Sequence, residues 1–233
     1  MFVTYSLEDA RMQLQDAANK RRLHQWTKEH PDSFAPIVFP FECVRFPVGV
    51  FFIRGDRAGP GKTLAEQVVA SFGYWNDDSG KYFDMVFPGW AKDGELIHFD
   101  RDAFLSFRRE IEAMSKYRYS GQTDILLLNY DYPVGGEIGD FSLDEAIVLP
   151  VEEMVRDGRI SNLDALMHEL ICDAKDMFQQ ESSNVIWDIS DKRAVEGGRK
   201  ALLKLIKQKF LKDLVKVYDE LKPFAVCDLR LPK

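Results

Sequence analysis

Residues 59–63, which read GPGKT, combine side chains and backbone freedom suited to holding a phosphate group. Glycines leave backbone N–H groups accessible, the first turn of a following helix attracts anions, lysine adds positive charge and a threonine hydroxyl can hold magnesium. Arg57 adds a guanidinium, which binds phosphate through paired hydrogen bonds. The residues predicted to contact a nucleotide-type ligand here are Arg57, Gly59, Gly61, Lys62 and Thr63.

This loop resembles the phosphate-binding loop of P-loop NTPases in its second half only. That motif reads G-x-x-x-x-G-K-[ST], and residues 61–63 match its end. The first glycine of the motif falls on Asp56, Gly55 lies one residue too early, and Pro60 lacks an N–H group. Three interpretations stay open: a divergent P-loop NTPase, a loop that binds another phosphate or ribose group, and a loop that only caps its helix.

Three carboxylates near predicted strand ends or glycine loops are candidates for acid–base catalysis. Asp56 follows the first predicted strand, Asp131 follows the apolar segment DILLLNY, and Glu137 lies between glycines. Carboxylates in such positions act as general acids and bases in hydrolysis. If the ligand is hydrolysed, we expect the reaction at a phosphate or glycosidic bond of an NTP-like or NAD-like nucleotide.

Two aromatic residues are candidates for stacking on a base. Trp90 follows the predicted strand Tyr82–Phe87, and Tyr132 follows the segment DILLLNY. Bases stack on aromatic rings without regard to sequence. Trp90 is therefore included among the predicted ligand-binding residues.

A strand, a glycine loop and a helix must position these groups. Val48–Ile53 is apolar, as expected of a buried strand, and Thr63–Phe72 has its apolar residues spaced along one helical face. Strand, glycine loop and helix form the unit of α/β nucleotide-binding domains.

The rest of the pattern predicts a doubly wound, mainly parallel sheet of the Rossmann-like three-layer kind, with an N-terminal helix and extra C-terminal helices. Ile125–Leu128 lacks polar alternation, which is typical of a central strand in a parallel sheet. Ligands of such sheets bind beyond the carboxyl ends of the strands. We therefore expect Asp56, Trp90 and Asp131 in one cleft.

We expect one domain over residues 1–233. It comprises an N-terminal helix and edge segment over 1–47, a core over 48–155 and a helical extension over 156–233. The finer expectations are helix N-caps at Ser6 and Ser161, a strand at Val185–Ile189, a long helix at Lys192–Lys222 and a last strand at Phe224–Leu231. Residues 141–150 fit a strand or a helix.

Composition restricts the class of protein. Hydrophobic residues make up 45% and charged residues 30%, as in soluble globular proteins, and the net charge of −7 makes nucleic acid an improbable partner. The three cysteines suggest neither a disulfide framework nor a zinc site, and no metal ligands or particular cofactor are predicted. With neither a signal peptide nor a membrane span recognised, we expect a cytoplasmic protein without membrane contact.

A non-catalytic subunit of a homomeric or heteromeric complex is the main alternative to a nucleotide-binding enzyme. Lys192–Lys222 carries ten basic and four acidic residues. This basic helix or the N-terminal helix would then contact a protein partner, or another copy of the chain in an oligomer.

Overall fold

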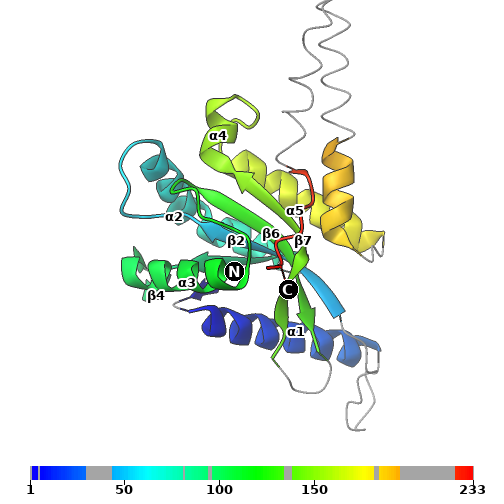
Figure 1. The fold of residues 1–233 in the computed structure, drawn as a ribbon. Coiled ribbons are helices and arrows are strands. Elements are labelled where there is room, and N and C mark those ends of the chain that lie inside the picture. Colours follow the sequence, from blue (N-terminus) through cyan, green and yellow to red (C-terminus); the bar gives the residue numbers. More distant parts are fainter. Residues whose placement is uncertain are drawn as a thin grey trace, which may run out of the picture.

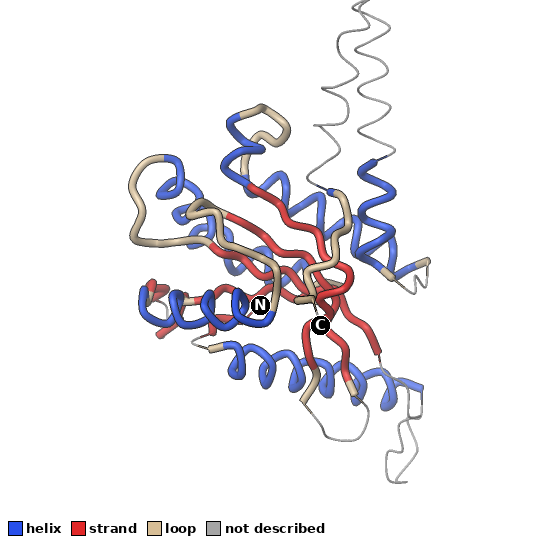
Figure 2. The backbone as a smooth tube through the Cα atoms, in the orientation of Figure 1, coloured by secondary structure: helices blue, strands red, loops and turns tan. Residues whose placement is uncertain are grey.

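The structure is a computed structural model that describes residues 2–4, 6–29, 44–80, 82–93, 96–133, 138–180, 184–194 and 224–232. These residues form a mixed α/β fold in which helices cover both faces of a central sheet (Figures 1 and 2). The strands are β1 (Phe2–Thr4), β2 (Val44–Phe52), β3 (Asp84–Pro88), β4 (Trp90–Asp93), β5 (Leu96–Phe99), β6 (Asp124–Tyr132) and β7 (Asp140–Pro150). The helices are α1 (Leu7–Glu29), α2 (Pro60–Ser79), α3 (Arg101–Met114), α4 (Val151–Arg156) and α5 (Leu163–Gln179), followed by helical residues 185–194.

The main sheet is mixed, with the strand order β1-β3-β2-β6-β7. β3 runs parallel to β1 and β2, whereas β6 runs antiparallel to β2 and β7 antiparallel to β6. The predicted mainly parallel sheet is therefore wrong, although the mixed α/β class is confirmed. β6 and β7 are joined by residues 133–139, a connection too short for the crossover that parallel neighbours need.

The two faces of the sheet have separate apolar cores. Ile125 and Leu127 of β6 pack with α2, α4 and α5, while Leu126 and Leu128 pack with α1 and α3. Both sides of β6 are thus covered, which explains its unalternated apolar sequence. The apolar side of α1 is used inside this fold, because Leu14 is fully buried in the second core.

Several boundaries differ from the sequence-based expectations. The Ser6 N-cap is confirmed, since its Oγ accepts a hydrogen bond from the Asp9 N–H at 3.0 Å. The cap of α5 is Asn162, one residue after the predicted Ser161. Residues 141–150 lie in β7, which ends at Pro150.

The predicted strand Val185–Ile189 is wrong, because residues 185–194 are helical. Its apolar run is short and fits either state, and Asn184 supplies an acceptor to the Trp187 N–H at the start of the helix. Of the predicted helix Lys192–Lys222, residues 195–222 lie outside the described part of the chain.

The end of the described chain returns to the edge strand β7. Cys227 and Ala146 exchange two backbone hydrogen bonds, of 2.8 and 3.0 Å. The predicted strand Phe224–Leu231 is therefore present as two isolated bridges, Cys227 with Ala146 and Arg230 with Ser115, and not as a full strand. Among the described residues, none of the helices combines the length and apolar character needed to cross a bilayer.

Candidate functional site

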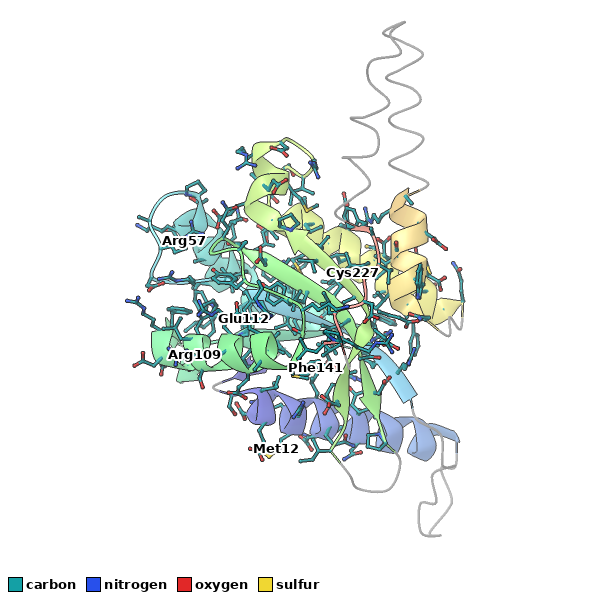
Figure 3. All side chains as sticks on the ribbon, viewed as in Figure 1. Met12, Arg57, Arg109, Glu112, Phe141 and Cys227 are labelled. Atoms are coloured by element: carbon teal, nitrogen blue, oxygen red, sulfur yellow. The ribbon has the colours of Figure 1, made fainter. Side chains whose placement is uncertain are left out.

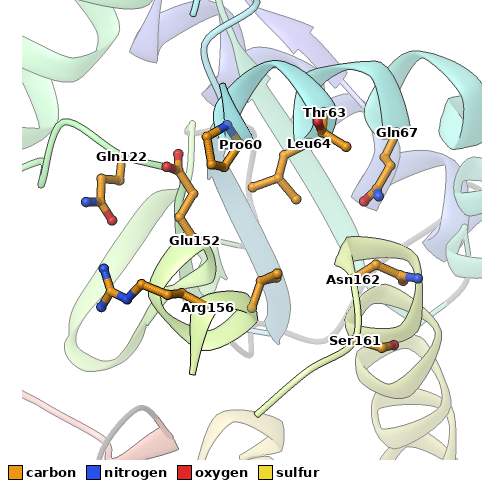
Figure 4. Close-up of a pocket in the computed structure, with 10 residues that line it drawn as sticks. Pro60, Thr63, Leu64, Gln67, Gln122, Glu152, Arg156, Ser161 and Asn162 are labelled. Atoms are coloured by element: carbon orange, nitrogen blue, oxygen red, sulfur yellow. The ribbon is translucent and has the colours of Figure 1, made fainter. Parts of the chain in front are cut away.

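A pocket of about 570 Å³ lies where the first turns of α2 and α5 approach α4 (Figure 4). Its lining residues are Pro60, Thr63, Leu64, Gln67, Gln122, Glu152, Val155, Arg156, Ser161 and Asn162. The volume falls within the range of small-molecule sites, which combine an apolar wall with a few placed polar groups. Pro60, Leu64 and Val155 supply the apolar wall.

The start of α2 makes one side of this pocket electropositive. Gly59 is the N-cap with φ 71° and ψ −146°, a conformation open essentially to glycine alone. The N-cap Gly59 makes no side-chain cap hydrogen bond, and the first turn of α2, which is fully described, contains no acidic residue. No residue of that turn offsets the partial positive charge of the helix end, and Arg156, which pairs with Asp157 at 3.3 Å, adds a guanidinium to the pocket.

Glu152 is the carboxylate of the pocket, and the loop before α2 holds it. The Arg57 guanidinium donates to its Oε1, and the Thr123 backbone N–H and hydroxyl donate to the same oxygen at 2.8 and 3.0 Å. These three hydrogen bonds, all from described residues, fall on Oε1 and fix the carboxylate at the edge of the pocket.

The predicted phosphate loop reaches the pocket only in part. Thr63 lines it, and Arg57 contributes through Glu152 while its side chain packs over Gly61. Lys62 is 65% exposed and pairs with Glu66 at 3.6 Å along the outside of α2. The lysine therefore does not reach back over the loop as it does in P-loop NTPases.

Asp56 is held outside the pocket lining by arginines. Its two oxygens accept from Arg54 at 2.8 Å each, and Arg101 lies 3.7 Å away. The hydrogen bonds from Arg54 hold the pKa of this carboxyl below its usual range. Such a group stays ionised and is a poor proton donor, so Asp56 is a weak choice for a general acid.

Asp124, on the neighbouring strand β6, has a carboxyl pKa that is shifted in the opposite direction from that of Asp56. Burial raises the pKa of its carboxyl, and hydrogen bonds from Ser120 and Tyr117 offset part of that effect. The folded protein therefore keeps the Asp124 proton to higher pH than the unfolded chain, and loses the Asp56 proton at lower pH.

These opposite shifts predict opposite pH dependences. As the pH rises above the unfolded carboxyl pKa of about 4, Asp124 lowers the free energy of unfolding, because the folded state binds more protons. Asp56 stabilises the fold by a constant amount above the unfolded carboxyl pKa, and this contribution is lost as the pH falls through its folded pKa. Relative to wild type, Asp124→Asn should become more stable as the pH rises from about 4 to about 7. Asp56→Asn should be less stable by a constant amount over that range, and its deficit should shrink as the pH falls below about 4.

Urea unfolding of both variants at several pH values measures these differences. Each variant serves as the control for the other, because both lose one carboxylate at the same end of the sheet. A flat difference for Asp124→Asn, or the same slope for both, would contradict the assigned environments.

Trp90 does not present its ring to a ligand, contrary to the sequence-based expectation. It is 3% exposed, its Nε1–H donates to the Ile53 carbonyl at 2.7 Å, and its ring packs edge-on against Phe99. The indole therefore supports the chain that leaves β2. Tyr132 is also buried, with its hydroxyl 3.5 Å from Asp84.

Asp131 lies at the other end of the sheet from the loop that follows β2. It is opposite Arg45 in the antiparallel β2–β6 pair and forms an ion pair with it at 3.0 Å. Arg45 and Phe52 are seven positions apart in β2, which is roughly 23 Å of strand. In Figure 3, Arg57 and Phe141 lie in different parts of the molecule, and Phe141 pairs with Tyr130, the neighbour of Asp131 in β6. The expected cleft joining Asp56, Trp90 and Asp131 is therefore wrong, and Glu137 lies outside the described residues.

The pocket contains functional candidates that the sequence analysis missed. These are Gln67, Gln122, Glu152, Arg156 and Asn162. The local signal was Pro150 followed by the acidic pair Glu152 and Glu153, a pattern typical of a helix start. The helix itself was not predicted, since residues 141–150 fitted either a strand or a helix.

Comparisons of the chain with protein-family models, curated proteins and solved structures give no match. Function is therefore inferred from the residues of the pocket.

Proposed function

We propose that the pocket between α2, α4 and α5 binds a nucleotide-type ligand, with its phosphate between the start of α2 and Arg156. The observation that carries the proposal is the pairing of an uncapped helix N-terminus with a guanidinium in one pocket of about 570 Å³. Helix N-termini and arginine both favour phosphate oxygens. The apolar side chains of Leu64 and Val155 give a base or sugar a surface to pack on.

If the ligand is hydrolysed, Glu152 replaces Asp56 and Asp131 as the candidate general base. Its Oε1 is held by Arg57 and Thr123, and the carboxylate would take a proton from an attacking water. The scissile bond would be a phosphate or glycosidic bond within reach of this oxygen. Glu152→Gln keeps an acceptor for Thr123 and should abolish turnover while nucleotide binding persists.

A thermal-shift screen with ATP, GTP, NAD and deoxynucleotides, each with and without magnesium, tests the binding proposal. Binding at 100 times the dissociation constant adds about 2.7 kcal/mol to the free energy of unfolding, which is a readily measured shift. We expect Arg156→Ala to weaken binding about tenfold or more, because it removes a charge-assisted phosphate contact. Arg156 is 65% exposed, so this variant should fold normally.

Lys62→Ala is the matched control, since it also removes one exposed cation near the start of α2. Binding that survives Lys62→Ala and fails in Arg156→Ala supports this pocket. The reverse result, with a requirement for magnesium, would favour the divergent P-loop NTPase. No shift with any nucleotide would contradict the proposal.

A non-catalytic subunit is the second candidate function. The observation in its favour is that Val69 and Tyr74 on α2 are 44% and 62% exposed. Contiguous exposed apolar surface is frequent where another protein binds. Light scattering that reports an oligomer, together with no nucleotide shift, would favour this candidate.

A further inference from the structure

The outward side of α2 carries a continuous exposed stripe. α2 packs on the sheet beside α5 through Leu64, Val68 and Trp75 (Figure 1). Successive residues of a helix turn by about 100°, so the opposite side is formed by positions three or four apart. The residues at those positions are all exposed, and they are Lys62, Glu66, Val69, Ala70, Gly73, Tyr74 and Asp77.

The middle of this stripe is small and apolar. Val69 and Tyr74 are 44% and 62% exposed, and the exposed residues Ala70 and Gly73 lie between them in the sequence. A Cβ atom on Gly73 would meet no other part of the chain within 4 Å, so packing within the molecule does not require a glycine there. Glycine in a helix interior is less stable than alanine, but it allows close approach to the backbone. The middle of α2 is therefore suited to contact with a second helix.

The two ends of the stripe carry opposite charges. Lys62 lies at the N-terminal end and is 65% exposed, and Asp77 lies fifteen positions later, toward the C-terminal end. Two antiparallel copies of α2, related by a twofold axis between positions 69 and 70, would place each Lys62 opposite the Asp77 of the other copy. Both residues lie roughly 11 Å along the helix from that axis. A parallel pair would instead bring like charges together.

We propose that a second copy of this chain packs on the outward stripe of α2, in an antiparallel α2–α2 dimer whose two ends are joined by Lys62 and Asp77. The occupant is a second copy because the charge order of the stripe is complementary to itself when reversed. The same register brings the apolar middles together, with Val69 opposite Ala70. Helices that pack at about 20° have axes about 8–10 Å apart, which keeps the charged ends within reach of a lysine side chain.

This dimer is compatible with either candidate function, since none of the stripe residues lines the pocket. Lys62 already contacts Glu66 of its own helix at 3.6 Å, so in the dimer it lies between two carboxylates. The pairing uses exposed groups only and requires no rearrangement of the core.

Sedimentation velocity of the full chain over a range of concentrations tests the dimer. A contact made by one helix is smaller than a standard protein interface, so we expect a reversible equilibrium with a micromolar dissociation constant. A chain that stays monomeric up to about 1 mM would overturn the inference and would leave the stripe for a different protein.

Val69→Lys tests whether the dimer uses this stripe. It places two like charges beside the twofold axis and should raise the dissociation constant at least about tenfold. Met12→Lys is the matched control, because Met12 is a 50% exposed apolar residue on α1, and its dissociation constant should not change. A dimer that survives Val69→Lys, or that is lost equally in Met12→Lys, would overturn the assignment to α2.

A charge exchange tests the antiparallel register. Lys62→Glu and Asp77→Lys each bring like charges together at both ends, and each should raise the dissociation constant at least about tenfold. The double variant restores opposite charges in reversed order, so its dissociation constant should return to within about threefold of the wild-type value. Damage to the monomer would not be repaired in this way. Single variants that still dimerise normally, or a double variant that stays monomeric, would overturn the pairing of Lys62 with Asp77.

Discussion

Gly89→Ala should lower the free energy of unfolding by more than about 3 kcal/mol, the largest single-residue effect that we expect in this fold. Gly89 joins β3 to β4 with φ 74°, and its carbonyl accepts the Asp100 N–H at the start of α3. A Cβ atom there would lie 2.5 Å from the Phe104 Cβ and 2.6 Å from the Asp100 carbonyl oxygen. Neither atom can move without shifting α3 against the sheet.

Gly121→Ala is the matched control for this prediction. Gly121 also has a positive φ, of 83°, but a Cβ atom there would meet nothing within 4 Å. Gly121→Ala should lower the free energy of unfolding by only about 1–2 kcal/mol, which is the cost of placing a residue with a Cβ atom in the left-handed backbone region. Urea unfolding followed by circular dichroism gives both values, and equal losses in the two variants would contradict the close packing of β3 on α3.

Asp173→Ala should lower the free energy of unfolding by about 3 kcal/mol and release the helical residues 185–194 from α5. The Asp173 side chain is 4% exposed, pairs with Arg193 and lies 2.7 Å from the Lys192 ammonium. Its removal leaves two cations close together, one of them only 10% exposed. Urea unfolding measures the loss, and limited proteolysis measures the release of the helix.

Asp176→Ala provides the comparison. Asp176 also binds Lys192, at 3.0 Å, but it is 51% exposed, and exposed pairs contribute at most about 1 kcal/mol. The account of this contact is contradicted if both substitutions cost the same, or if residues 185–194 remain protected from protease in Asp173→Ala.

The local elements could be predicted because their signals are local. The apolar run of β6 and the Ser6 cap were each readable from a few neighbouring residues, and the structure contains them. The direction of β6 could not be read in the same way. An apolar strand covered on both faces has the same sequence pattern in a parallel and an antiparallel setting.

The site was harder to predict because its composition depends on the direction in which β6 runs. With β6 antiparallel to β2, Asp131 moves to the far end of the sheet and Glu152 of α4 approaches Arg57. One available clue was the short glycine-rich connection before β7, which favours a hairpin. The burial of Trp90 had no such local signal, since it depends on the position of the Ile53 carbonyl.

The residues that line the pocket could not be predicted either, because they come from distant parts of the chain. Gln67 and Asn162 are 95 positions apart in the chain and meet only because α2 and α5 pack on the same face of the sheet. Each is an ordinary polar residue of a helix or a cap when considered alone. They are brought to the same pocket by the hydrogen bond from the Leu163 N–H to Gln67, a contact that only the packed helices create.

Hydrogen–deuterium exchange with and without the nucleotide that gives the largest thermal shift, at saturating concentration with magnesium, tests the central claim most directly, because it reports where a nucleotide binds. Exchange should slow in the first turn of α2, in α4 and at the start of α5, with little change in the strand ends around Arg45 and Asp131. The same protection should be lost in Arg156→Ala. Protection centred on Arg45 and Asp131, or none in any peptide of the pocket, would contradict the assignment of this pocket as the nucleotide site.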